Sequence, residues 1–289
     1  MDSLLKRISN YLSLVKFSHT VFAMPFALLG FFTAISAGDN EFTWRLFILV
    51  LLCMVFARNS AMGFNRYADY KFDRLNPRTS SREIPSGIIK PGSALIFVTV
   101  NAILFIISAS LINRLTMFLS PLALFIILGY SMTKRFTSMS HLFLGLALSL
   151  APVGAYISVT GEFATVPLLY SLIVLFWVGG FDIIYSLQDS EFDSVNSLFS
   201  LPAKLGLKQA LVISAFFHFL AVLSATVSGL IAHSGLLYWI GTVIFSMMLV
   251  YEHIIIKPGD NKSISRAFAM INSYAGLAFC AFAIADLYI

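Results

Sequence analysis

Charged residues are scarce in this chain: they make up 11% of its 289 residues, whereas hydrophobic residues make up 58% and the mean hydropathy is +0.87. A water-soluble domain of this size needs far more polar surface, so the composition excludes one. Lipid leaves only helices and closed barrels as spanning structures, and the apolar runs are about twenty residues long rather than about ten. We therefore predict an all-α polytopic membrane protein that forms a single domain over residues 1–289.

Sequence signals for several other kinds of site are also missing. The only two cysteines, Cys53 and Cys280, fall within long apolar runs, which is typical of small buried residues rather than of a disulfide or a metal pair. The chain contains no glycine-rich phosphate loop of the Walker A kind and no HExxH or HxxxH zinc pattern. The N-terminus shows neither a cleavable signal pattern nor an Arg- and Ser-rich transit peptide, so we expect a bacterial inner membrane.

Long apolar runs separated by polar breaks predict about nine membrane-spanning helices. The expected spans cover residues 15–36, 44–68, 92–112, 114–132, 139–159, 165–188, 208–231, 235–256 and 265–287. Each is close to the roughly 20 residues that a helix needs to cross the hydrocarbon core. The break at Asn113 and Arg114 is the weakest, and one long or re-entrant segment is the alternative there.

The basic residues predict the orientation of these helices. With a cytoplasmic N-terminus, 17 of the 19 Lys and Arg residues fall on the cytoplasmic side, and only Arg45 and Arg114 do not. Cytoplasmic loops of membrane proteins are enriched in Lys and Arg, so we expect the N-terminus inside and the C-terminus outside. This topology accounts for the net charge of +5, and no nucleic-acid partner is needed to explain it.

Two clusters of carboxylates lie where long apolar runs give way to polar cytoplasmic loops. They consist of Asn65, Asp69 and Asp73 in the first cluster and of Asp182, Tyr185, Asp189 and Asp193 in the second. A carboxylate beside hydrocarbon is costly, so each cluster indicates a functional site. Four-residue spacing places side chains on one helix face, where like charges need a cation between them. Such hard oxygen ligands suit Mg²⁺, which commonly shares its coordination shell with substrate phosphates.

The surroundings of the two motifs indicate what such a metal would hold. Facing one another across a helix bundle, the motifs could bind a diphosphate through one or more Mg²⁺ ions, which would stabilise it as a leaving group. Nearby cations could complete the site or could merely fix the topology, namely Arg78, Arg82, Lys134 and Arg135. With 28 Phe in the chain, we expect a lipid-borne diphosphate, and Phe, Tyr130 and Tyr185 could line a dry pocket for an allylic cation.

Over nearly its whole length, the chain resembles the UbiA family of membrane aromatic polyprenyltransferases. The resemblance rests on the two acidic motifs in order, on Asn76-Pro77-Arg78-Thr79 with Arg82 and Pro85-Ser86-Gly87, and on Tyr130 with Lys134-Arg135. It implies nine helices around a central cavity capped by cytoplasmic loops. It also implies that a polyprenyl chain is transferred from its diphosphate to an aromatic ring, with Mg²⁺ bridging the Asp motifs and the diphosphate. The ring carbon next to a phenolic hydroxyl would attack the allylic cation.

The first polar loop departs from the family pattern in a way that bears on the acceptor. Many members read Arg-Pro-Leu-Pro where this chain reads Arg82-Glu83-Ile84-Pro85. The version found here resembles the futalosine branch of menaquinone synthesis as much as it resembles the 4-hydroxybenzoate enzymes. The expected acceptor is therefore 4-hydroxybenzoate or a dihydroxynaphthoate, in ubiquinone or menaquinone biosynthesis. Both carry a carboxylate, for which Arg58 is the expected partner.

Two other functions stay open on the sequence alone. Intramembrane carboxylates also serve secondary transporters, although transporter sites usually lie near the membrane midplane on broken helices, whereas these acids gather at one membrane face. The second open function is that of a haem- or chlorophyll-type prenyltransferase of the UbiA superfamily. His141, His218 and His253 are expected to have structural or interfacial roles.

Overall fold

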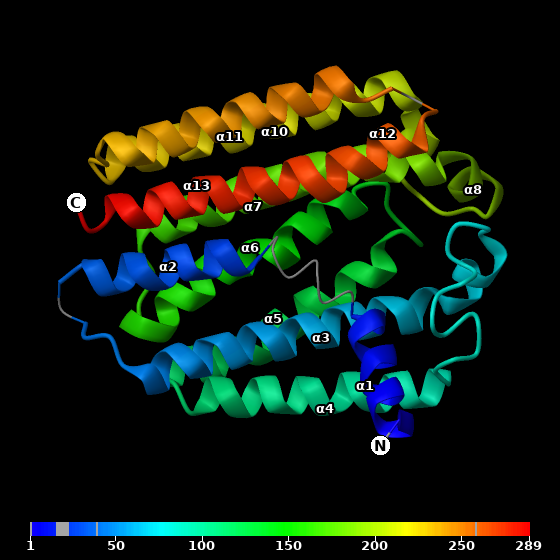
Figure 1. Cartoon of the computed structure of the whole chain (residues 1–289), viewed down its shortest axis with the longest axis horizontal. Helices are drawn as coiled ribbons and strands as arrows, with labels where there is room; N and C mark the ends of the chain where they lie inside the picture. Colours follow the sequence, from blue (N-terminus) through cyan, green and yellow to red (C-terminus); the bar gives the residue numbers. More distant parts are fainter. Residues whose placement is uncertain (1, 16–22, 39, 258) are drawn as a thin grey trace.

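The computed structural model describes residues 2–15, 23–38, 40–257 and 259–289, which form helices joined by loops, and no strand occurs within these ranges (Figure 1). Within these ranges, seven helices are long and apolar enough to cross a membrane. They are α3 (Trp44–Leu75), α4 (Pro91–Ser110), α5 (Arg114–Thr133), α6 (Ser140–Thr160), α7 (Thr165–Ser186), α10 (Leu207–Ile231) and α11 (Leu236–Ile255). The prediction of an all-α polytopic membrane protein is thus confirmed.

The first and last of the nine predicted spans are not among these seven. Within the predicted span 15–36, residues 16–22 lie outside the described part of the chain, and α2 (Met24–Ser36) is a shorter apolar helix. The predicted span 265–287 corresponds to α12 (Asn261–Arg266), the π-helical turn η3 (Ala267–Ile271) and α13 (Asn272–Asp286), which follow one another directly. A count of nine spans therefore stays a prediction.

The predicted break between the third and fourth spans is confirmed. The backbone N–H of Thr116 donates to Asn113 Oδ1 over 2.8 Å, which caps the N-terminus of α5. The amide Nδ2 of Asn113 also donates to the carbonyl oxygen of Ile157 on α6 over 2.8 Å. Residues 111–113 are therefore a fixed turn between two helices, and the alternative of one long or re-entrant segment was wrong.

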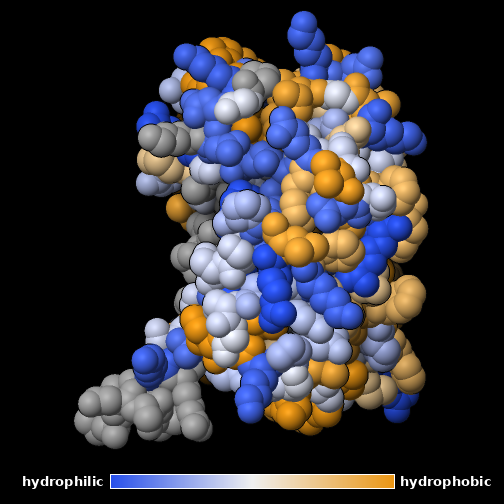
Figure 2. Space-filling view, turned by 90° about the vertical axis from the view of Figure 1, so that its right-hand side faces the viewer, coloured by the Kyte–Doolittle hydropathy of each residue, from blue (hydrophilic) through white to orange (hydrophobic). Residues whose placement is uncertain are grey.

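The two ends of the bundle differ in polarity and in the length of their connections. At one end, the short segments 111–113, 161–164 and 232–235 join neighbouring helices. At the other end lie the loop 76–90 and the segment 187–206, which contains the short helices α8 (Ser190–Val195) and α9 (Leu201–Leu205). Hydrophilic side chains gather across this face, which we call the polar end (Figure 2). The structure thus brings both predicted long polar loops to one end of the bundle.

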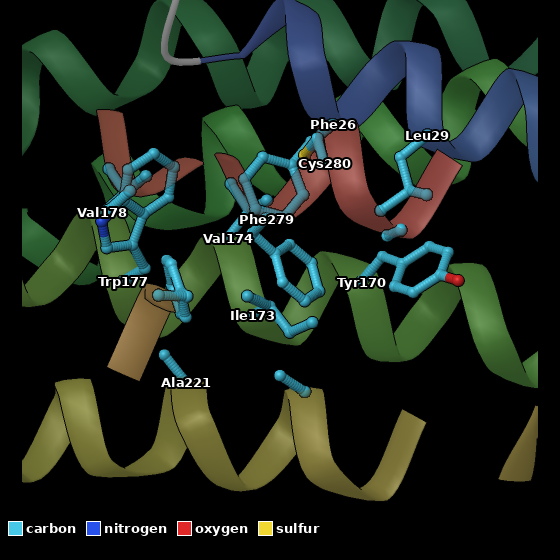
Figure 3. Close-up of a cluster of buried hydrophobic side chains, with 14 of the residues drawn as sticks. Phe26, Leu29, Tyr170, Ile173, Val174, Trp177, Val178, Ala221, Phe279 and Cys280 are labelled. Carbon is cyan, nitrogen blue, oxygen red and sulfur yellow. The ribbon is translucent and has the colours of Figure 1, made fainter. Parts of the chain in front are cut away.

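Helix α7 lies in the middle of the largest hydrophobic core, between α2 and α13 on one side and α10 on the other (Figure 3). Trp177 is fully buried there, and its Nε1 donates to Asn272 Oδ1 over 2.9 Å. On the α6 side, a Cβ atom at Gly145 would lie 2.2 Å from the Leu175 carbonyl oxygen, so only glycine permits this close approach. Packing against α2, α6, α10 and α13 therefore fixes the helix that carries Asp182.

Candidate active site

A cavity of about 820 Å³ extends from the polar end into the bundle between α3, α5, α6 and α7. Its polar part is lined by every member of the two acidic motifs, which are Asn65, Asp69, Asp73, Asp182, Tyr185, Asp189 and Asp193. Other parts of its wall are apolar, with Val50, Met54, Leu148, Ala151 and Ala155 among the lining residues. The structure therefore brings together two motifs that lie more than 100 residues apart in the sequence.

The first motif lies on a single helix, as its spacing predicted. Helix α3 continues to Leu75, beyond the predicted end of the span at residue 68, so Asn65, Asp69 and Asp73 occupy successive turns. The amide Nδ2 of Asn65 donates to Asp69 Oδ2 over 3.2 Å. All three residues line the same cavity.

The second motif departs from the single helix face that its spacing predicted. Helix α7 ends at Ser186, and the 3₁₀ turn η2 (Leu187–Asp189) leads into α8. Asp182 and Tyr185 therefore lie on α7, Asp189 on η2 and Asp193 on α8. A 3₁₀ turn has about 3.0 residues per turn instead of about 3.6, which rotates the residues that follow it. The prediction of one helix face was wrong for this motif, although all four side chains still line the cavity.

All four predicted cations lie at this site, and each pairs with a carboxylate of a segment other than its own, Arg78 with Asp189. The nitrogen-to-oxygen distances are 2.7 Å for Arg82 and Asp73, 3.5 Å for Arg135 and Asp69, and 3.5 Å for Lys134 and Asp193. Burial lowers the pKa of Lys134, but the surrounding carboxylates, above all Asp193, outweigh burial and raise the pKa above its ordinary value. The side chain is therefore cationic at neutral pH, and the carboxylates are charge-compensated by the protein itself.

Arg78, the fourth cation, connects the loop 76–90 to the second motif. Its Nε donates to Asp189 Oδ1 over 2.9 Å, and its Nη1 donates to the Tyr185 hydroxyl oxygen over 2.9 Å. The guanidinium carbon also lies 5.3 Å from the centre of the Tyr185 ring, within cation–π range. Asn76, at the end of α3, donates to the same Asp189 Oδ1 over 3.1 Å. Burial lowers the pKa of Arg78. The hydrogen bond to Asp189 and the negative charge of that carboxylate outweigh the effect of burial, so the pKa is raised above its ordinary value.

Arg58 lies about two turns before Asn65 on α3 and lines the same cavity. It is close enough to Tyr130 on α5 for the two side chains to interact electrostatically. The structure thus places the predicted partner of an aromatic carboxylate inside the cavity, where its role as that partner stays a prediction.

His141 is a site residue that sequence reasoning missed. It is fully buried at the start of α6, and its Nδ1 lies 2.7 Å from Asp182 Oδ2. Its Nε2 accepts a hydrogen bond of 3.4 Å from the Leu201 backbone N–H, so Nδ1 carries the proton and donates to the carboxylate. The expected structural role of His141 therefore includes orienting Asp182. No local pattern reveals this contact, because the two residues are 41 positions apart.

We expect His141→Ala to lower the catalytic rate by about 10- to 100-fold, as the loss of a partner that orients a metal-binding side chain usually does. The substitution His141→Asn should restore most of the rate, since the Asn amide can donate from the position of Nδ1. Steady-state rates of both variants, each with its thermal unfolding midpoint in detergent, measure this effect. Equal rates for the Ala and Asn variants would show that the hydrogen bond to Asp182 is unimportant.

The donor set of the site suits a hard cation that is shared with a ligand. The six predicted metal ligands all carry side-chain oxygen atoms and line one cavity, and they are Asn65, Asp69, Asp73, Asp182, Asp189 and Asp193. Among the residues that the structure describes, no three His, Cys, Asp or Glu side chains converge closely enough to hold a metal by themselves. Mg²⁺ usually keeps several waters and binds one or two carboxylates together with substrate phosphates. The residues therefore fit Mg²⁺ bound with a diphosphate better than an all-protein metal cage.

A bundle of membrane-spanning helices, with a polar-ended cavity between them and two acidic motifs facing into it, defines an integral-membrane enzyme for amphiphilic substrates. The chain belongs to the UbiA prenyltransferase family, whose model matches residues 23–274. It is therefore a prenyltransferase, and the family membership decides against the secondary transporter that the sequence left open.

Proteins similar to this chain cover most of its length. It is 28% identical to the 4-hydroxybenzoate octaprenyltransferase of Aliivibrio fischeri strain MJ11, over 87% of this chain and 88% of that protein. The enzyme of the same name from Paraburkholderia phytofirmans is 28% identical over 84% of each. The apo structure of a UbiA homolog from Aeropyrum pernix K1 matches with a TM-score of 0.83 and 31% identity, over 93% of this chain and 98% of that chain. A UbiA homolog from Archaeoglobus fulgidus, solved with DMAPP and Mg²⁺, shares the fold with a TM-score of 0.74 and 21% identity. The match covers 97% of this chain and 99% of that chain.

Proposed function

We propose that this protein transfers a polyprenyl chain from polyprenyl diphosphate to a hydroxylated aromatic carboxylate, 4-hydroxybenzoate or a dihydroxynaphthoate, in a Mg²⁺-dependent reaction of quinone biosynthesis. One observation carries the proposal: two acidic motifs and four cations converge on the polar part of a cavity whose other walls are apolar. The polar part suits a diphosphate, and the apolar part suits a prenyl chain. The named activity of the Aliivibrio relative and the DMAPP and Mg²⁺ bound to the Archaeoglobus homolog support this assignment.

The residues of the polar part would bind the diphosphate and assist its departure. When bound, Mg²⁺ would supply charge neutralisation at the diphosphate oxygens, held by the carboxylates of the two motifs. Arg78 and Arg82 can grip phosphate oxygens through two N–H groups each, while Lys134 and Arg135 add positive charge beside them. Tyr185, fixed by Arg78, presents its ring to the site, where it can stabilise an allylic cation.

The acceptor would bind on the apolar side of the two motifs. Arg58 would pair with its carboxylate, and the apolar walls of the cavity would exclude water, which would otherwise capture the allylic cation. In this arrangement the carboxylate points away from the motifs. The ring carbon beside the hydroxyl then faces the prenyl chain and attacks it.

We further infer that residues 1–289 act as one domain in a bacterial inner membrane, with the N-terminus in the cytoplasm, the C-terminus outside and the polar end facing the cytoplasm. The distribution of Lys and Arg supports this orientation. Water-soluble acceptors and released diphosphate would then exchange with the cytoplasm, while the prenyl substrate comes from the bilayer.

A direct assay tests the proposed reaction. Purified protein in nanodiscs is incubated with Mg²⁺, a polyprenyl diphosphate and either 4-hydroxybenzoate or a dihydroxynaphthoate, and prenylated products are identified by mass spectrometry. We expect product with one of the acceptors, its loss in EDTA and its recovery when Mg²⁺ is added back. Folded protein that forms no product with either acceptor would overturn the proposed substrate class.

A further inference from the structure

Arg66 is a buried cation to which the proposed function assigns no contact with the diphosphate or with the carboxylate of the acceptor. It lies on α3 beside Asn65, is only 4% exposed and lines the cavity. Its Nε has no hydrogen-bond partner among the described residues, and it takes part in none of the ion pairs found there. A buried guanidinium N–H group without a hydrogen-bond acceptor is costly, so an oxygen with negative charge is the complementary group for this position.

Glu83, in the loop 76–90, is the matching acceptor. It is 8% exposed and lines the same cavity. Its Oε1 accepts a hydrogen bond from the Ser13 hydroxyl, whereas its Oε2 is buried and has no hydrogen-bond partner. A buried carboxylate oxygen with free acceptor capacity suits a ligand that presents an O–H or N–H group.

The two side chains belong to one part of the cavity. Arg66 interacts electrostatically with Glu83, with Asp73 and with Arg82. Both Asp73 oxygens accept from Arg82 Nη1, over 2.7 and 2.9 Å, and Asp73 does not satisfy the Nε of Arg66 among the described residues. Arg58 lies eight residues earlier on α3, about 12 Å along the helix axis. A ring whose carboxylate reaches Arg58 would therefore direct its opposite substituent toward Arg66 and Glu83.

We propose that Glu83 and Arg66 activate the aromatic acceptor: Glu83 takes the proton of its phenolic hydroxyl, and Arg66 stabilises the phenolate oxygen. This inference rests on the proposed function. As the negative charge enters the ring, the carbon beside the oxygen forms a bond to the prenyl C1 atom, and the diphosphate leaves with the electrons of the C–O bond. The ring carbon that formed the new bond then loses its proton to water or diphosphate. Glu83 returns its proton to the phenolate oxygen. Glu83 is thus regenerated, and the net products are the prenylated phenol, diphosphate and one proton.

The substitution Glu83→Gln tests the proton transfer and leaves the local structure in place, because the Gln amide oxygen can still accept from Ser13. We expect the variant to lower kcat by about 10²-fold with little change in the KM for prenyl diphosphate. An acceptor with fluorine on a ring carbon beside the hydroxyl is a more acidic phenol and needs less help from a base. The ratio of wild-type to variant kcat should therefore fall to about 10 or less with the fluorinated acceptor.

The substitution Arg66→Gln tests the other half of the pair, and we expect it also to lower kcat by about 10²-fold. Glu191→Gln is the matched control, since Glu191 is exposed on α8 and does not line the cavity. A Glu83→Gln variant with the wild-type kcat, or with an equal defect for both acceptors, would overturn the inference. So would an Arg66→Gln variant that raises only the KM for prenyl diphosphate. In each case the wild-type protein still forms product, so the proposed function would stand.

Discussion

Replacing Asp69 or Asp182 by alanine is expected to lower prenyl transfer at least about 10³-fold, which corresponds to about 4 kcal/mol of lost transition-state stabilisation. The two residues are the first carboxylates of their motifs, on α3 and on α7, and both line the polar part of the cavity. Removing either one takes away a group that would hold Mg²⁺ against the leaving diphosphate. Product formation by mass spectrometry at saturating Mg²⁺ measures the effect.

Both variants should remain folded, because the partners of the removed carboxylates keep other contacts. Arg135 still donates to the Ala68 carbonyl oxygen over 2.7 Å when Asp69 is replaced. His141 still accepts from the Leu201 backbone N–H when Asp182 is replaced. Glu191→Ala, which removes an exposed carboxylate next to the second motif, should keep the wild-type rate. Wild-type rates in the Asp69 or Asp182 variants would contradict the assigned site.

Arg78→Lys is expected to lower kcat/KM by about 10²-fold, although it keeps the positive charge. Arg78 contacts Asp189 and Tyr185 through different nitrogens of one planar group, and a Lys ammonium cannot reproduce that geometry. The substitution should therefore misplace the second motif and also weaken the grip on a diphosphate. Single-turnover rates at several concentrations of prenyl diphosphate separate the two effects.

Arg74→Lys is the matched control for Arg78→Lys, since Arg74 is an exposed residue in the last turn of α3 and does not line the cavity. It should leave the rate and the thermal unfolding midpoint unchanged. If Arg78→Lys behaves like this control, the contacts of Arg78 seen in the structure do not matter for the reaction.

The parts of the site that could be predicted from sequence are those set by local geometry or by the membrane. The spacing of Asn65, Asp69 and Asp73 placed them on one face of α3, because a regular helix repeats about every 3.6 residues. The distribution of basic residues indicated that the polar loops lie at one end, and the structure brings both predicted loops together there. The 3₁₀ turn at Leu187 was not predicted, because no proline or glycine marks it.

Contacts between distant segments could not be predicted in the same way. His141 and Asp182 meet only because α6 and α7 pack closely at Gly145. Arg66 is one of the basic residues that the topology argument already explained, so its burial beside the cavity gave no separate signal in the sequence. Such residues stand out only when burial and missing partners are known, and both depend on the packed structure.

The pairing of carboxylates with cations from other segments of the chain also has a consequence for how the protein is made. As the chain enters the bilayer from its N-terminus, Asp69 is synthesised before Arg135, and Lys134 before Asp193. Neither pair can form until the later segment has been inserted, so charges of the early helices stay uncompensated beside lipid until α8 is in place. A truncated or misinserted chain would therefore retain exposed charges at the membrane surface, by which quality-control proteases could distinguish it from the finished enzyme.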